Sequence, residues 1–592
     1  MKYTEKQGLI AGFITVLALY FIYIYLWINP SLYLLRGFRE FFTDVYFFQR
    51  FFNFPGNPAD YFSRLFIQFY RYPLPASAMI SLVMGGIYLL GLYVWRAKKA
   101  AYLVAAIPVF VLALMHNDYR HSIRFDVDVL FLLAGLSIFK WSLRHRVLSY
   151  VSFPVLLVAV LYLNGILTAA LLTAGVFLAT LFCRRETGMF LSVAAGIALA
   201  AFLSRFMFGL GVHDLMQEVT DASRIYTYRY FPFVLYAAIL LPYLAVHLPD
   251  SKFKIPYLPV ATVAVAFAVL ACTSNRDEKN GLSVQHCAVN GQWDAALDYA
   301  RKCKYPDLDV VIFTNEALHR TGRICDELFM YNQSFGSDGL MSAEIGNYSG
   351  ILPNQDVFLH LGALSLSIVW GTEATNVYGA NPYVLRNLAK AYLAGGYVAE
   401  AHKILNLLER TPFDKAWAAR YRTFANDTTL IDGDPELQAC KQAQAPLAAV
   451  ATQSVLMNLY LLARDAKRNR MAYDYLLIAS LLDHKPEYFA SYLSGLKDYG
   501  YTTIPKLYLE GLIYYSLYGA ELPVDVRTFA FDPKILDRFE SFRNDLAAAG
   551  RQPDSMKETL GHKYGDTYWY YLLFGSNLSN GEKLSIFNRI TM

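Results

Sequence analysis

Long apolar segments separated by short polar ones fill the first half of the chain. A helix that crosses a membrane needs about 20 predominantly apolar residues, and segments near that length recur as far as residue 272. The pattern predicts an all-α fold with a polytopic transmembrane domain over residues 1–272. We expect about nine spans, near residues 8–28, 76–95, 100–115, 127–141, 147–163, 165–183, 188–210, 231–248 and 255–272.

Residues 29–75, between the first two expected spans, follow a different pattern. Apolar side chains recur at helical spacing over 34–47 and again over 61–70, with charged residues between them. The Pro-Gly-Asn-Pro sequence at 55–58 is typical of the end of one helix and the start of the next. We therefore expect two amphipathic helices that lie in the outer membrane interface.

Beyond residue 272 the apolar runs shorten and charged residues appear at helical spacing, which predicts a second helical domain over 273–592. Residues 291–296 (Gly-Gln-Trp-Asp-Ala-Ala) have the pattern glycine-x-aromatic-x-x-alanine, and 388–405 followed by Pro412 form a fuller unit. These two segments resemble the tetratricopeptide repeat. The resemblance implies an extracytoplasmic α-solenoid whose concave surface binds a peptide or protein partner.

The composition agrees with a membrane protein. The chain is 55% hydrophobic and 17% charged, whereas ordinary soluble domains carry about 25% charged residues. This composition disfavours a single soluble globular protein and excludes a disordered chain. The net charge of +5 combines a basic first half with a mildly acidic second half. Because no soluble basic domain is present, we expect no nucleic-acid partner.

The distribution of Lys and Arg predicts the orientation in the lipid bilayer. Basic clusters at 2–6, 96–99, 140–146, 184–185 and 252–254 fall at alternate ends of the expected spans, all on one side. The positive-inside rule makes that side cytoplasmic. We expect a multi-pass protein of a bacterial inner membrane, with a cytoplasmic N-terminus and a periplasmic C-terminal domain.

Away from the cytoplasmic ends, every basic residue of the first half is an arginine. Guanidinium groups bind phosphate in a bidentate manner, so the outer face is predicted to bind a phosphate, such as that of a lipid-linked donor. Arginines that snorkel to the headgroups are the alternative, and Arg205 either snorkels or faces a polar cavity. The candidate substrate-binding residues are Arg36, Arg39, Arg120, Arg124, His121, Arg205 and Arg224.

The second outer connection carries acidic residues beside the hydrocarbon, where charge is costly and a function is the default hypothesis. Asp126 and Asp128 are two residues apart, and Asp118 is close to them in sequence. Carboxylates at this spacing can share a divalent cation such as Mg²⁺ or Mn²⁺. The alternative is a salt-bridged cap in which Arg120 or Arg124 pairs with Asp126.

Taken together, the spans, the long first outer loop and the outer helical domain resemble the membrane glycosyltransferases of the GT-C superfold. Members of that group place an acidic catalytic residue in a first outer loop made of two interfacial helices. The resemblance implies that Asp44 or Glu40 is the catalytic residue; the two are four residues apart, on one face of a predicted helix. It also implies a polyprenyl-phosphate sugar donor.

The predicted reaction transfers a sugar from that lipid-linked donor to an envelope protein or glycan on the outer face. A carboxylate would accept the proton of the acceptor hydroxyl, and arginines or a cation would stabilise the departing phosphate. A non-enzymatic membrane-anchored repeat scaffold for envelope protein assembly or secretion is the alternative. A transporter ranks third. Charged residues in the middle of the spans would favour it, but they are nearly absent, and Arg205 comes closest to such a position.

Overall fold

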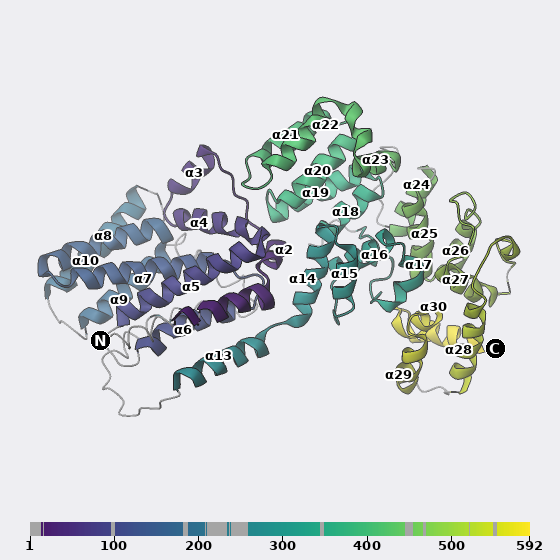
Figure 1. Cartoon of the computed structure of the whole chain (residues 1–592), viewed down its shortest axis with the longest axis horizontal. Helices are drawn as coiled ribbons and strands as arrows, with labels where there is room; N and C mark the ends of the chain where they lie inside the picture. Colours follow the sequence, from purple (N-terminus) through teal and green to yellow (C-terminus); the bar gives the residue numbers. More distant parts are fainter. Residues whose placement is uncertain are drawn as a thin grey trace. The chain divides into compact units, whose positions relative to one another are not determined.

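The computed structural model shows a helical protein (Figure 1). It confirms the predicted all-α class, because the described residues contain no strand beyond one isolated bridge between Thr503 and Ala530. The structure describes residues 13–15, 17–95, 101–181, 187–207, 209, 234–235, 237, 239, 258–343, 349–444, 454–465, 469–519, 521–548 and 553–591.

The chain divides into two compact units. The first comprises Met1–Arg276 with the short segment Arg410–Phe413, and the second comprises Asp277–Glu409 with Asp414–Met592. The helices of the first unit are η1 (Tyr23–Ile28), η2 (Pro30–Leu32), α2 (Tyr33–Gly37), α3 (Val45–Phe52), α4 (Asn57–Gln68), η3 (Phe69–Arg71), α5 (Pro73–Trp95), α6 (Ala101–Met115), α7 (Arg124–Ser142), α8 (Arg146–Asn164), α9 (Ile166–Ala179), α10 (Thr187–Phe206) and α13 (Leu258–Thr273).

Three helices in the described part of the chain, α5, α8 and α10, are long and apolar enough to cross a membrane. Helices α6, α7, α9 and α13 also lie at predicted spans, but they are shorter or carry more charge. Most of the predicted span at 231–248, and residues 8–12 of the first one, lie outside the described residues. The protein is therefore helical, with a few apolar helices that are compatible with membrane association.

The apolar helices pack closely against one another. Helix α8 packs against α7, α9 and α10, and α5 packs against α6 and α7. At Gly196 of α10, an added Cβ would lie 3.0 Å from the ring of Phe153 of α8. A small residue at this position lets the two helices approach each other, as is typical of helix pairs in membranes.

The segment between η1 and α5 corrects one prediction. Helix α2 ends at Gly37, and residues 38–43 are not helical. Asp44 then caps α3, because its carboxylate accepts the backbone N–H of Phe47. Such a local hydrogen bond favours a helix start over a helix interior. The prediction that Glu40 and Asp44 share one helix face is therefore wrong.

The predicted break at 55–58 is confirmed. Helix α3 ends at Phe52 and α4 begins at Asn57, with Pro58 in its first turn. Gly56 has a φ of +83°, which a residue with a side chain rarely adopts. Gly56 and Pro58 therefore define the start of α4, from which two charged side chains of the candidate site, Asp60 and Arg64, extend.

The second unit consists of helices, some of which are joined by short turns and others by longer segments. Its helices are α14 (Arg276–Val289), α15 (Trp293–Ala300), α16 (Leu308–Arg320), α17 (Ile324–Glu327), α18 (Ile351–His360), α19 (Leu364–Tyr378), α20 (Pro382–Ala394), α21 (Val398–Glu409), α22 (Lys415–Asn426), α23 (Pro435–Gln442), α24 (Val455–Asp465), α25 (Arg470–Leu482), α26 (Pro486–Leu493), α27 (Lys506–Ser516), α28 (Lys534–Ala548), α29 (Pro553–Tyr564), α30 (Tyr568–Tyr570) and α31 (Asn580–Thr591).

Consecutive helices of this unit pack against one another from α18 to α22 and again from α24 to α27. The turns predicted around Gly291 and Gly396 are present, and both glycines have positive φ values, +69° and +80°. Leu388 and Ala391 of α20 and Leu405 of α21 are buried in the core. Helix pairs therefore form where the repeat-like segments predict them.

Candidate functional site

The polar residues of the first unit gather where α6 ends and α7 begins. Backbone hydrogen bonds keep the connecting turn tight: the N–H of His116 donates to Leu112, and the N–H of His121 donates to Asp118. Helix α7 then starts at Arg124. The turn places ionisable side chains on two sides of α7, where they form two separate groups.

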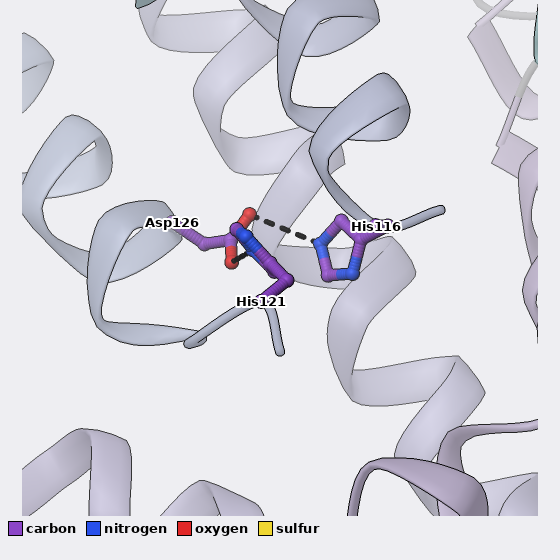
Figure 2. A group of neighbouring side chains, drawn as sticks. All are labelled: His116, His121 and Asp126. Carbon is purple, nitrogen blue, oxygen red and sulfur yellow. Dashed lines mark hydrogen bonds and ion pairs between the residues drawn. The ribbon is translucent and has the colours of Figure 1, made fainter. Parts of the chain in front are cut away.

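The first group is the histidine–aspartate cluster, defined as His116, His121 and Asp126 (Figure 2). Nε2 of His116 lies 3.2 Å from Oδ1 of Asp126, and Nε2 of His121 lies 2.7 Å from Oδ2. All three side chains are buried, each no more than 1% exposed. The cluster is therefore one carboxylate held between two imidazoles that approach it through the same ring nitrogen.

Aromatic residues surround the cluster. The hydroxyl of Tyr33 donates to the backbone carbonyl of His116 and lies 3.4 Å from Nδ1 of its ring. Tyr119 donates to the carbonyl of Ile28 at 2.9 Å, which ties the turn to η1. Burial lowers the pKa of His116, although the charge of Asp126 acts in the opposite direction. The hydrogen bonds of Tyr33 and Tyr119 therefore hold the connecting turn and the ring of His116 in place.

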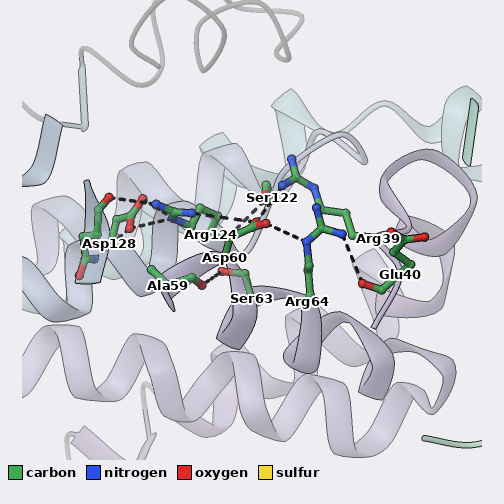
Figure 3. A network of polar contacts seen from close by, with 10 residues as sticks. Arg39, Glu40, Ala59, Asp60, Ser63, Arg64, Ser122, Arg124 and Asp128 are labelled. Atoms are coloured by element: carbon green, nitrogen blue, oxygen red, sulfur yellow. Dashed lines mark hydrogen bonds and ion pairs between the residues drawn. The ribbon is translucent and has the colours of Figure 1, made fainter. Parts of the chain in front are cut away.

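The second group is the arginine–aspartate network, defined as Arg39, Asp60, Arg64, Arg124 and Asp128 (Figure 3). Asp60 of α4 accepts a hydrogen bond from Arg39 at 2.9 Å and one from Arg64 at 2.7 Å. Arg124 lies 4.0 Å from Asp60 and donates to Asp128 at 3.0 Å. The network thus joins α4 and the segment before α3 to the start of α7.

Asn164, the last residue of α8, completes this arrangement. Its side-chain amide donates to Asp128 at 2.9 Å, and its backbone carbonyl accepts a hydrogen bond from Arg124 at 2.9 Å. The ends of α7 and α8 are therefore fastened together at the network. Such support from the ends of helices fixes the positions of the charged groups.

The network carries three guanidinium groups and two carboxylates. Burial would raise the pKa of Asp60, but Arg64, Arg39 and Arg124 together lower it, so this carboxylate is ionised. Its five side chains are between 13% and 36% exposed, so solvent and solutes reach them. The positive surplus on partly buried arginines suits an anion with several oxygens, such as a phosphate.

The structure divides the predicted metal-binding set. Asp126 and Asp128 are two residues apart on α7, so their side chains point about 200° apart. Asp126 belongs to the histidine–aspartate cluster and Asp128 to the arginine–aspartate network, whereas Asp118 accepts the backbone N–H of Arg120. The three acids therefore do not surround one cation. The predicted salt-bridged cap is also corrected, because Arg124 pairs with Asp128 rather than Asp126.

Of the predicted catalytic acids, Glu40 contacts the network through its backbone, whereas the Asp44 carboxylate pairs with Arg410 at 2.7 Å. The backbone carbonyl of Glu40 accepts a hydrogen bond from Arg64 at 3.3 Å, and Asp44 caps α3. Of the predicted substrate-binding residues, Arg39 and Arg124 belong to the network, His121 belongs to the cluster, and Arg120 is exposed on the connecting turn. Two of the predicted residues lie partly or wholly outside the described residues. Arg224 does so entirely, and Arg36 does so for its side chain.

Arg205 lies elsewhere, at an apolar groove of about 1020 Å³ between α8, α9 and α10. Residues such as Leu157, Phe177 and Val193 line the groove, and Ser204 and Arg205 are its polar contributors from the last turn of α10. In the part of the chain that the structure describes, Arg205 therefore adjoins an apolar groove and not the polar cavity considered from the sequence.

Sequence reasoning missed Asp60, Arg64, His116 and Asn164 as site residues. Asp60 and Arg64 have the spacing of an ion pair on one helix face, and this pair follows a strong helix-start signal, so it could have been found. The spacing of five between His116, His121 and Asp126 is not a recognised ligand pattern. The three side chains come together only because of the turn between α6 and α7.

A second group of acids and imidazole lies in the other unit, formed by Glu316, Asp356 and His360. Nδ1 of His360 lies 2.7 Å from Glu316 and 3.9 Å from Asp356. Arg320 lies 3.7 Å from Glu316, and Lys390 pairs with the neighbouring Glu436 at 2.6 Å. Cationic side chains therefore already balance the negative charge of this group.

Fold and site together define a helical protein with apolar helices compatible with membrane association and a polar centre at the ends of several of them. The chain matches, over residues 5–575, a family described as a family of unknown function, DUF6057. Because the match covers most of the chain, the protein belongs to this family. No curated protein and no solved structure matches the chain.

Proposed function

We propose that the protein is a membrane glycosyltransferase that transfers a sugar from a polyprenyl-phosphate donor to an envelope protein or glycan. The observation that carries this proposal is the arginine–aspartate network: three partly buried guanidinium groups beside two carboxylates, at the ends of apolar helices. A lipid-linked sugar donor requires a phosphate-binding group at the membrane boundary. The network has the charge and the exposure for that role.

The orientation of α7 supports an outer location for the network. This helix runs for 19 residues from Arg124 in the network to Ser142, a length of about 28 Å. Lys140, near its other end, belongs to the basic cluster predicted to be cytoplasmic. Because the hydrocarbon core is about 30 Å thick, the two ends of α7 suit opposite membrane faces. The proposal places the network on the outer face.

The apolar groove supports a lipid-linked donor. Its volume of about 1020 Å³ and its lining by α8, α9 and α10 suit a flexible hydrocarbon chain. Arg205 stands near one end of the groove, in the last turn of α10, and can attract a phosphate. We propose that the polyprenyl chain occupies this groove.

The proposed reaction needs no nucleotide, since the phosphate of the donor is itself the leaving group. The acceptor hydroxyl attacks the anomeric carbon, a new carbon–oxygen bond forms, and the bond to the phosphate oxygen breaks with its electron pair. Arg39 and Arg124 stabilise the negative phosphate. The hydroxyl proton passes to a carboxylate. We propose Asp60, which lies at the centre of the network, for this role; Asp44 and Glu40 are the residues that the resemblance implies.

The remaining parts of the proposal concern the whole architecture. The nine predicted spans form the donor-binding domain, and the second unit forms a tetratricopeptide-like solenoid that recruits the peptide or protein acceptor. Consecutive packing of α18 to α22 supports a repeat arrangement. The proposed location is a bacterial inner membrane, with the second unit in the periplasm.

The experiment compares glycans of envelope proteins, by mass spectrometry, in cells that lack this chain and in cells that express defined variants. The deletion should remove a specific glycan, and the wild-type chain should restore it. Asp60→Asn and Arg124→Ala should fail to restore it at wild-type protein levels. Arg50→Ala is the matched control, because Arg50 is an exposed arginine of α3, and this variant should restore the glycan.

Restoration of the glycan by both Asp60→Asn and Arg124→Ala would refute the proposal. An unchanged glycan profile in the deletion strain, combined with rescue of its envelope phenotype by the second unit on an unrelated membrane anchor, would favour the scaffold alternative. One set of strains therefore distinguishes the glycosyltransferase from the non-enzymatic scaffold.

A further inference from the structure

We infer that His116, His121 and Asp126 bind one divalent transition metal ion, for which zinc is the best-fitting candidate. This inference is independent of the proposed glycosyl transfer, because it concerns metal content and needs neither donor nor acceptor. It also replaces the acidic cation site that the sequence suggested with a site of different chemistry.

The donor atoms favour a transition metal. Two imidazole nitrogens and one carboxylate oxygen form a ligand set that suits zinc and other first-row divalent ions. Mg²⁺, in contrast, prefers oxygen ligands in an octahedral arrangement with several waters. A site with two nitrogen donors in a dry, aromatic environment therefore selects against the Mg²⁺ predicted from the acidic residues alone.

A modest movement of His121 or Asp126 would make room for an ion, because Nε2 of His121 lies 2.7 Å from Asp126. The potential ligand atoms all lie within 4.8 Å of one another, and Nε2 of His116 lies 3.2 Å from Asp126. Ligands placed 2.0–2.1 Å from a tetrahedral zinc are about 3.4 Å apart. Both imidazoles present Nε2, so the opposite ring nitrogen, Nδ1, faces outward. On His116, that nitrogen lies 3.4 Å from the hydroxyl of Tyr33, as outer partners of metal-bound histidines commonly do.

The second unit offers the alternative site, Glu316, Asp356 and His360. We favour the histidine–aspartate cluster because Arg320 already lies 3.7 Å from Glu316. A cation would have to enter beside this guanidinium. Within the histidine–aspartate cluster, by contrast, Asp126 pairs with the two imidazoles, and imidazoles are themselves zinc ligands.

The test measures metal in the purified full chain by inductively coupled plasma mass spectrometry, after chelator treatment and exposure to zinc. About one zinc per chain is expected for the wild type. His121→Ala and Asp126→Asn should bind zinc at least roughly 100-fold more weakly, because loss of a ligand costs more than loss of a ligand's partner. His145→Ala, which removes an exposed histidine, and His360→Ala should both retain it.

His121→Cys guards against the case in which the other variants fail to fold. A thiolate also binds transition metals, so this variant should keep one metal per chain. With Co²⁺ in place of zinc, it should gain a thiolate-to-cobalt absorption band that the wild type lacks. Loss of zinc in His360→Ala but not in Asp126→Asn would overturn the inference. So would a wild type that binds no zinc, or a cobalt-loaded His121→Cys variant without the band.

Discussion

At the residue scale, the two polar groups of the first unit show how close neighbours on a helix acquire different chemistry. Asp126 is enclosed by two imidazoles, whereas Asp128 bonds to a guanidinium and an amide. Two residues of separation on a helix turn a side chain about 200° around the axis. The sequence pair Asp-x-Asp therefore supplies one acid to each group, and a substitution at either position should affect one group without removing the other.

The buried ion pairs of His360 make a prediction at the same scale. Burial alone would lower the pKa of His360, but the charge of Asp356 and the hydrogen bond to Glu316 raise it to about 9. The stabilisation from the charged imidazole is fully present below about pH 6.5 and is lost as the pH rises through about 9. Thermal unfolding of wild type and His360→Gln between pH 6.5 and 9.5 measures this pH-dependent stabilisation.

The melting temperature of the wild type should fall more over this range than that of His360→Gln, since the variant lacks the titrating group. His402→Gln, on the nearby α21 of the same unit, is a control for loss of a partly exposed histidine. Parallel pH curves for wild type and His360→Gln would contradict the ion-paired state of His360.

At the scale of elements, the length of the apolar runs predicted most helices of the first unit, and hydrophobic periodicity predicted helices between the first two runs. It failed over 38–44, where apolar residues keep helical spacing but Asp44 starts a new helix by capping it. A single local hydrogen bond there outweighs the periodic pattern. The helical break at Gly56 was predictable because Gly and Pro restrict the backbone themselves.

The candidate site was less predictable than the helices. Arg39, Arg124 and His121 were found because ionisable residues at a membrane boundary are unusual. Which residues pair with each other depends on the tertiary arrangement: Asp60 meets Arg39 and Arg124 only when α4 lies beside the start of α7. No spacing along the chain records that approach, so the division into two groups required the structure.

The capping role of Asp44 gives a prediction for α3. Asp44→Ala should destabilise the protein by about 0.5–2 kcal/mol, since the N–H of Phe47 loses its acceptor and Arg410 loses its ion-pair partner. Asp44→Ser should recover the part of that loss that comes from the cap, because serine also caps helices. Chemical denaturation of both variants measures the effect. If Asp44 were instead the catalytic base, Asp44→Ser would abolish glycan transfer while the cap was preserved, and that result would contradict our choice of Asp60.

At the scale of the whole molecule, the first unit contains apolar helices compatible with membrane association, and the second unit is helical. The first contains an apolar groove, a positively charged network and a buried cluster of two histidines and one aspartate, whereas the second contains consecutively packed helices. The chain belongs to a family of unknown function. In the proposed account, chemistry occurs in the first unit and acceptor recognition in the second.

The most direct measurement of the central claim is the release of polyprenyl phosphate from a radiolabelled polyprenyl-phosphate sugar. The full chain is reconstituted in proteoliposomes, and an extract of envelope proteins from the deletion strain supplies the acceptor. The wild type should transfer label to protein and release the lipid phosphate in equal amounts. Asp60→Asn should be slower by about 10²–10⁴-fold, and Arg50→Ala should match the wild type. Wild-type release no greater than that of empty liposomes, or equal rates for wild type and Asp60→Asn, would contradict the account.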